Sequence, residues 1–124
     1  MIHEWVLPDD LTAARAARAL IDEALDAAGV GGEPRDDAIL IASELAANGV
    51  RHGKPPISLT LSIHGDRLRI TIANHGDSLD PRIVAADPHA PHGRGLAMVE
   101  ALATEVGWER DADRLDVWAE IALP

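Results

Sequence analysis

The sequence contains no cysteine, no phenylalanine and no tyrosine, and lysine occurs once, at Lys54. The absence of cysteine excludes disulfide bonds, cysteine-ligated zinc and thiol catalysis. Because tryptophan, with three copies, is the only large aromatic residue, the core must be built from leucine, isoleucine, valine and alanine. Apolar residues make up 47% of the 124 residues, which is enough for the interior of a single domain over residues 1–124.

The chain also has little positive charge and no long apolar run. Its formal net charge is −10, which argues against direct binding of nucleic acid or of an anionic membrane surface, because both need clustered basic side chains. No apolar stretch approaches the roughly 20 residues that a membrane-spanning helix needs. The first ten residues, MIHEWVLPDD, are acidic and have no signal-peptide pattern. We therefore expect a cytoplasmic protein with no membrane association.

The N-terminal third reads as one strand followed by one amphipathic helix. Residues 2–7 form a short candidate strand that Pro8 ends, and Asp9 or Asp10 can cap the helix that follows. Between residues 13 and 28, alanine, leucine and isoleucine recur at the spacing of one helix face. This helix is expected to end at the glycines that follow.

A second helix and a hairpin are predicted next. Pro34 is well placed to start the helix, which should end at Gly53, with Pro55 and Pro56 beyond it. From residue 57 to residue 72 the apolar residues instead alternate with polar ones, on both sides of a Gly-Asp turn. This period of two predicts a pair of antiparallel strands.

The C-terminal part adds one helix and two strands to this pattern. Residues 74–92 form a long connection, a third helix should run from about Gly95 to Ala103, and strands should occupy about 105–110 and 114–123. The order strand, helix, helix, strand, strand, helix, strand, strand favours a mixed, mostly antiparallel sheet with helices on one face. The predicted fold class is an α/β two-layer sandwich.

The stretch SELAANGVRHG carries a polar row on the apolar second helix. Glu44, Asn48 and His52 are four residues apart, so they lie on one slanted line. The row can be the solvent-facing stripe of an amphipathic helix, but such a stripe normally carries several long charged residues. Partly buried carboxylate and amide groups need partners, and a divalent cation with a polyanionic ligand would provide them.

Two further stretches can contribute to a ligand site. In IANHG a strand leads into Asn74 and then Gly76, where an amide can bond a base edge and a glycine can admit a flat ring; an ordinary strand-ending turn would look the same. In HGRGL, Gly93 and Gly95 precede a helix, whose free N–H groups can meet phosphate oxygens. A simple loop-to-helix turn is the alternative there.

Taken in this order, the three stretches resemble the GHKL (Bergerat-fold) superfamily, in particular the stand-alone anti-sigma-factor serine/threonine kinases. The resemblance implies a single histidine kinase-like ATP-binding domain with ATP and Mg²⁺ as cofactors. ELAANGVRHG looks like the family's N-box. By that match Glu44 is the general base and Asn48 the Mg²⁺ ligand, while Arg51 or His52 lies near the phosphates.

The two glycine-containing stretches match the family's glycine boxes. NHG occupies the position of the first box, where the family usually has aspartate rather than Asn74 and where Gly76 is the glycine. The carbonyl of Asn74 can still accept a hydrogen bond from adenine, without charge assistance. HGRGL matches the second box. Its implied phosphate-binding residues are Gly93, Arg94, Gly95 and Leu96.

The resemblance implies a serine/threonine kinase of a partner-switching system. Its partners would be a sigma factor and an anti-anti-sigma protein of the STAS type, and related regulators often form homodimers. Asn74 also motivates an alternative, a non-catalytic regulator that binds partners and has a degenerate nucleotide site. A weaker alternative is a metal hydrolase that uses His75, His89 and His92. Trp118, on the polar face of the last strand, could contribute to a partner or dimer surface.

Overall fold

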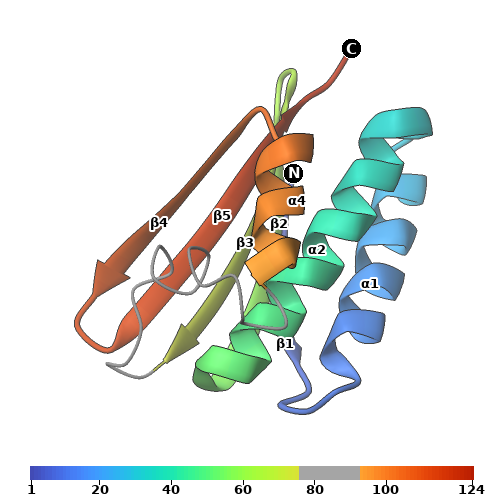
Figure 1. The fold of residues 1–124 in the computed structure, drawn as a ribbon. Helices are drawn as coiled ribbons and strands as arrows, with labels where there is room; N and C mark the ends of the chain where they lie inside the picture. Colours follow the sequence, from blue (N-terminus) through green and yellow to red (C-terminus); the bar gives the residue numbers. More distant parts are fainter. Residues whose placement is uncertain (76–92) are drawn as a thin grey trace.

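The computed structural model describes residues 1–75 and 93–124, the side chains of residues 93–96 excepted. Within these ranges one sheet of five strands is covered by helices on one of its faces (Figure 1). The predicted α/β two-layer sandwich is therefore confirmed. The elements are β1 (Ile2–Leu7), α1 (Ala13–Ala27), α2 (Gly32–His52), β2 (Lys54–His64), β3 (Arg67–His75), α4 (Gly93–Leu102), β4 (Glu105–Asp111) and β5 (Arg114–Ala122).

The sheet has the strand order β1-β2-β3-β5-β4, and each of its pairings is antiparallel. The parallel component that a mixed sheet would have is thus missing from the described strands. Hairpins join β2 to β3 and β4 to β5, whereas α4 carries the chain from β3 past β5 to the edge. β5 then returns between β3 and β4. It pairs with β4 because the two strands form a hairpin, and its other side pairs with β3.

Alternating apolar residues of the strands form one side of the core. Leu59 pairs with Ile72, and Ile70 pairs with both Leu61 and Ala119, so one face of the sheet is continuously apolar. The helices bury their apolar faces against it. The fully buried large side chains are Ile21, Leu25, Ile41, Leu45, Ile57, Leu59, Leu61, Leu68, Ile70 and Ile72.

Two boundaries differ from the sequence-based expectation. α2 begins at Gly32, two residues before Pro34, so the proline lies inside the first turn, where its missing N–H costs no hydrogen bond. β2 begins at Lys54 instead of at Ile57, so Pro55 and Pro56, which were expected to lie between helix and strand, belong to the strand. They fit there because the pairing of β2 with β3 is irregular between Lys54 and Ser58.

Polar contacts fix the ends of the two long helices. Asp10 accepts the backbone N–H of Thr12 at 2.8 Å, just before α1, and hydrogen bonds from Thr12 lower the pKa of Asp10. Arg35 of α2 donates to Asp22 at 2.6 Å and to Asp26 at 3.1 Å, so the two helices are tied side by side. Within the described residues, no helix combines the length and apolar character that crossing a membrane requires.

Candidate functional site

Three elements converge at one end of the sandwich. The C-terminal half of α2 packs against β3, α2 also contacts α4, and the start of α4 is directed toward the end of the molecule where α2 and β3 finish (Figure 1). The three stretches singled out in the sequence lie on these elements: SELAANGVRHG on α2, Asn74 on β3, and Gly93 to Leu96 in the first turn of α4. The fold therefore brings the polar row and the start of HGRGL to the same end of the domain.

The polar row on α2 is only partly open to solvent. Asn48 is 9% exposed, and its carboxamide Oδ1 is buried with no hydrogen-bond partner in the described part of the chain. Glu44 and His52, one turn before and after it, are half-buried, while Arg51 is exposed. A solvent-facing stripe does not account for Asn48, since a buried amide oxygen without a partner is unfavourable unless a ligand supplies one.

The second carboxamide, Asn74, lies inside β3 rather than beyond its end. It pairs with Leu115 of β5, and it is 7% exposed. Its side chain points at the last turn of α2, because a Cβ built at Gly53 would overlap its carboxamide and one built at Gly49 would lie 3.7 Å from its Nδ2. The site thus contains two buried amides, one on the helix and one on the strand.

Gly49 and Gly53 lie at the candidate site, and the sequence analysis did not assign them to it. A Cβ at Gly49 would come within 2.9 Å of Ile72 Cγ2, so only glycine lets β3 pack this closely against α2. The available signal was the small residue directly after Asn48, but its reason is a contact between residues far apart in the sequence. The two glycines set the separation between the two amides.

Helix polarity gives the two helix ends at this site opposite electrostatic character. α4 begins at Gly93, two residues earlier than expected, so the glycines of HGRGL form its first turn and their backbone N–H groups are those a helix leaves unbonded. At the C-terminus of α2, Arg51 and His52 complement the negative end of the helix dipole. The N-terminus of α4 therefore favours an anion.

Some predicted site residues fall outside the described parts. Gly76 and the metal candidates His89 and His92 are among them, and the side chains of Arg94 and Leu96 are as well. His75 is half-buried at the end of β3. In residues 1–75 and 93–124, no group of three or more His, Cys, Asp or Glu side chains is arranged to hold a metal ion.

An antiparallel sheet covered by helices on one face, with two buried amides where α2 meets β3, defines an α/β two-layer domain. Its family follows from comparison with known proteins. The model of the histidine kinase-like ATPase domain matches residues 7–121, and the chain belongs to this family. A comparison with curated protein sequences gives no match.

Two solved structures share the fold. The RsbU and RsbW domains of Rv1364c from Mycobacterium tuberculosis are 24% identical, with a TM-score of 0.75 over 99% of this chain. This chain spans 32% of that longer one. A chain of the SiaB–SiaC complex from Pseudomonas aeruginosa is 12% identical, with a TM-score of 0.68, over 98% of this chain and 88% of that one.

Membership of this family implies ATP as the ligand, and the residues at the site fit that group. The buried Oδ1 of Asn48 lacks a partner that a nucleotide-bound cation would supply, and the amide of Asn74 can bond the edge of a base. The first turn of α4 offers backbone N–H groups to phosphate oxygens.

Proposed function

We propose that this protein is an ATP-dependent serine/threonine kinase that regulates a sigma factor by partner switching in the cytoplasm. The observation that carries the proposal is the buried, unpartnered Oδ1 of Asn48, one helical turn after Glu44. An amide oxygen is a hard ligand suited to Mg²⁺, and a carboxylate one turn away can act as a general base. Together they form a pair suited to phosphoryl transfer.

Each remaining site residue has a proposed role in holding ATP. Asn74 bonds the base, and Gly76 lies beside it along the chain. Arg51 and His52 face the phosphates from the end of α2. When bound, Mg²⁺ neutralises charge on the phosphates. The start of α4 binds the phosphate oxygens, at Gly93, Arg94, Gly95 and Leu96.

The proposed reaction transfers the γ-phosphoryl group to a serine of a partner protein. Glu44 accepts the proton of the serine hydroxyl, whose oxygen forms a bond to the γ-phosphorus of ATP. The bond from the γ-phosphorus to the bridging oxygen breaks, and ADP leaves. Glu44 is half-buried, so part of its side chain stays accessible to an entering hydroxyl.

The proposed acceptor is an anti-anti-sigma protein of the STAS type. Phosphorylation would release this acceptor and leave the kinase free to hold its sigma factor. The SiaB–SiaC structure is a complex of two proteins, and one of its chains has a fold similar to that of this chain. This supports the idea that the domain works by binding protein partners. The net charge of −10 suits partners with basic surfaces.

A second candidate function rests on Asn74. An uncharged amide at this position makes a weaker bond to adenine than a carboxylate would, so the chain could regulate its partners by binding them without phosphoryl transfer. The two functions share the fold and the partners, and they differ in phosphate transfer. A stable complex with a partner and no phosphoserine would identify the non-catalytic regulator.

Calorimetric titration with Mg²⁺-ATP tests the nucleotide site. We expect saturable binding at one site, which Asn48→Ala weakens at least about tenfold because the amide oxygen is lost. Ser43→Ala, on the same helix, is the matched control and should bind as the wild type does. No binding of either Mg²⁺-ATP or Mg²⁺-GTP at millimolar concentration would rule out the kinase and leave the non-catalytic regulator.

A further inference from the structure

The two edges of the sheet differ in how they are protected from other strands. β4, at one edge, exposes Glu105, Glu109, Arg110 and Asp111, and charged side chains are a common device against strand pairing. β1 forms the other edge, and no described strand pairs with its outer side. Its face away from the helices exposes apolar side chains, and its only charged residue is Glu4.

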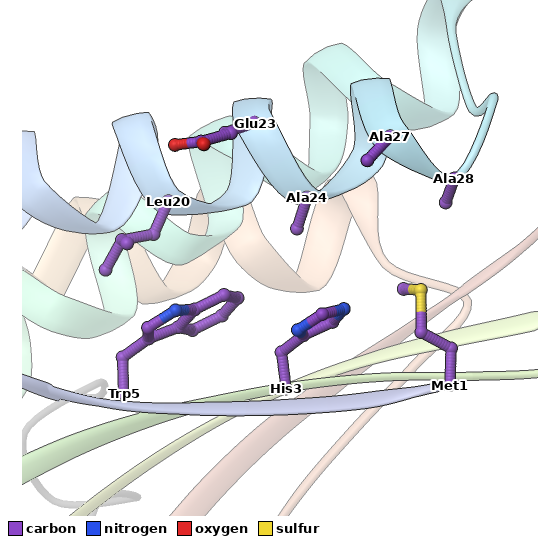
Figure 2. A pocket seen from close by; sticks show the side chains of 8 residues that line it. All are labelled: Met1, His3, Trp5, Leu20, Glu23, Ala24, Ala27 and Ala28. Atoms are coloured by element: carbon purple, nitrogen blue, oxygen red, sulfur yellow. The ribbon is translucent and has the colours of Figure 1, made fainter.

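A pocket of about 340 Å³ lies directly beside the β1 edge, between this strand and α1 (Figure 2). On the strand side, the rings of His3 and Trp5 are stacked, with centroids 5.5 Å apart and planes within 5° of parallel. On the helix side, Leu20 and Ala24 contribute apolar surface one turn apart. Glu23 is the one carboxylate among the described lining residues, and Figure 2 shows it on α1, with its side chain directed along the helix.

The outer face of the same sheet shows that a tryptophan close to a carboxylate can bind an arginine side chain. There the guanidinium carbon of Arg69 lies 4.0 Å from the centroid of the Trp118 ring, and its Nη2 is 3.3 Å from Glu120 Oε1. A planar cation stacked on tryptophan and paired with a carboxylate is a favourable arrangement for arginine. The α1–β1 pocket offers a tryptophan and a carboxylate, and no arginine or lysine of the described part of the chain lines it.

We infer that the β1 edge and this pocket bind an extended, arginine-bearing segment of a partner protein. The segment adds to the sheet as a further strand through backbone hydrogen bonds to β1. Its arginine enters the pocket, stacks on Trp5 and pairs with Glu23. Exposed apolar residues of β1, Ile2 at 65% and Val6 at 74%, pack against alternate side chains of the added strand.

A second copy of the chain fits this surface less well than a basic partner does. β1 contains no arginine or lysine, so the β1 strand of a second copy cannot supply the cation. Two copies also bring together net charges of −10 each, whereas a basic segment is attracted. The surface lies on the edge of the sheet away from β4, and Glu23 and Trp5 play no part in the proposed phosphoryl transfer. The inference therefore stands independently of the kinase proposal.

Amide NMR of the full chain with a synthetic peptide tests this inference. The probe is a blocked hexapeptide of alternating valine and arginine, and its matched control has citrulline, which is isosteric and uncharged, in place of arginine. We expect saturable shifts in residues 2–7 and 20–28, and at least about tenfold weaker binding of the citrulline peptide.

Two variants locate the arginine in the pocket. Glu23→Gln and Trp5→Leu should each weaken binding of the arginine peptide about fivefold to tenfold, while Glu33→Gln on α2 leaves it unchanged. Glu23 is exposed, so its variant tests the pocket even if Trp5→Leu perturbs folding. Equal binding of both peptides, shifts confined to β4, or a homodimer with β1 amides protected in its interface would each overturn the inference.

Discussion

The two halves of α2 lie on the same sheet but bury different chemistry. In the first half, residues 32–42, the buried residues are Ala38, Ile41 and Ala42, all apolar and packed into the core. In the second half Leu45 and Ala46 are still apolar, but the buried residues that follow are Asn48 and Gly49, and Asn74 faces them from β3. Position in the fold does not explain the change, because both halves pack against the same face of one sheet.

The difference shows where folding and ligand binding have separate demands. An apolar side chain at position 48 would be well accommodated beside the core, and burying an amide oxygen without a partner is unfavourable. The first half of α2 therefore stabilises the domain, and the second half is shaped for a bound group. Four changes along this helix and its contacts can break or sharpen the comparison.

Glu44→Gln should have the largest effect on function. If Glu44 is the general base, its loss should slow phosphate release from ATP, or transfer to an acceptor, by about 10²- to 10⁴-fold. Nucleotide binding should stay close to that of the wild type, because the shape of the side chain is kept. Steady-state turnover and calorimetry measure the two properties separately.

The control for Glu44 is Glu33→Gln, in the exposed first turn of the same helix. It removes the same charge far from the site, and we expect turnover to be unchanged. If both substitutions lower turnover equally, the effect is one of net charge and Glu44 has no catalytic role.

Ile41→Ala should have the largest effect on stability. Ile41 is fully buried in the first half of α2, so its truncation should lower the free energy of unfolding by about 2–5 kcal/mol. The neighbouring Leu40 is 38% exposed, and Leu40→Ala should change that free energy by roughly 0.5 kcal/mol. Urea denaturation measures both. Similar losses for the two variants would mean that this half of the helix is not packed as described.

Gly53→Ala should affect both stability and binding. The new Cβ would overlap the Asn74 carboxamide, which must move, and we expect a loss of about 1–3 kcal/mol in unfolding free energy with weaker nucleotide binding. A Cβ at Gly31 meets nothing within 4 Å, so Gly31→Ala serves as the matched control with a smaller effect. Unchanged binding by Gly53→Ala would separate Asn74 from the ligand.

Asn74→Asp should produce the smallest change, seen as base selectivity. An amide can both accept from the amino group of adenine and donate to the carbonyl oxygen of guanine, whereas a carboxylate can only accept. The ratio of ATP to GTP affinity should therefore rise about tenfold in this variant. Parallel calorimetric titrations measure the ratio, and an unaltered ratio would place the base elsewhere.

The element order followed from the sequence because each segment has one clear period. The alternation through Ile57, Leu59 and Leu61 could only be a half-buried strand, and the helical spacing through Ala17, Ile21 and Ala24 only a helix. The strand order could not be derived in the same way. Nothing local to β5 states that it returns between β3 and β4, since that depends on the crossover through α4.

The site was predictable to the extent that it lies on one helix. The four-residue spacing of Glu44, Asn48 and His52 was visible in the sequence. The structure buries Asn48 and leaves its Oδ1 without a hydrogen-bond partner in the described residues, which is the situation in which a ligand was expected to supply one. The contact of Asn74 with Gly53 and the pocket beside Trp5 were not visible. Both join residues that are far apart in the chain, and their geometry depends on how α1 and α2 pack on the sheet.

Urea unfolding of the wild type and Asn48→Ala, each with and without Mg²⁺-ATP, tests most directly whether this half of α2 is built for a nucleotide. Nucleotide at a hundred times its dissociation constant should raise the unfolding free energy of the wild type by about 2.7 kcal/mol. Without nucleotide, Asn48→Ala should lie within about 1 kcal/mol of the wild type, and the same concentration of Mg²⁺-ATP should stabilise it by at most about 1.4 kcal/mol. Equal stabilisation of both proteins by Mg²⁺-ATP, or a large loss of stability in the variant alone, would show that Asn48 serves the fold and not the ligand.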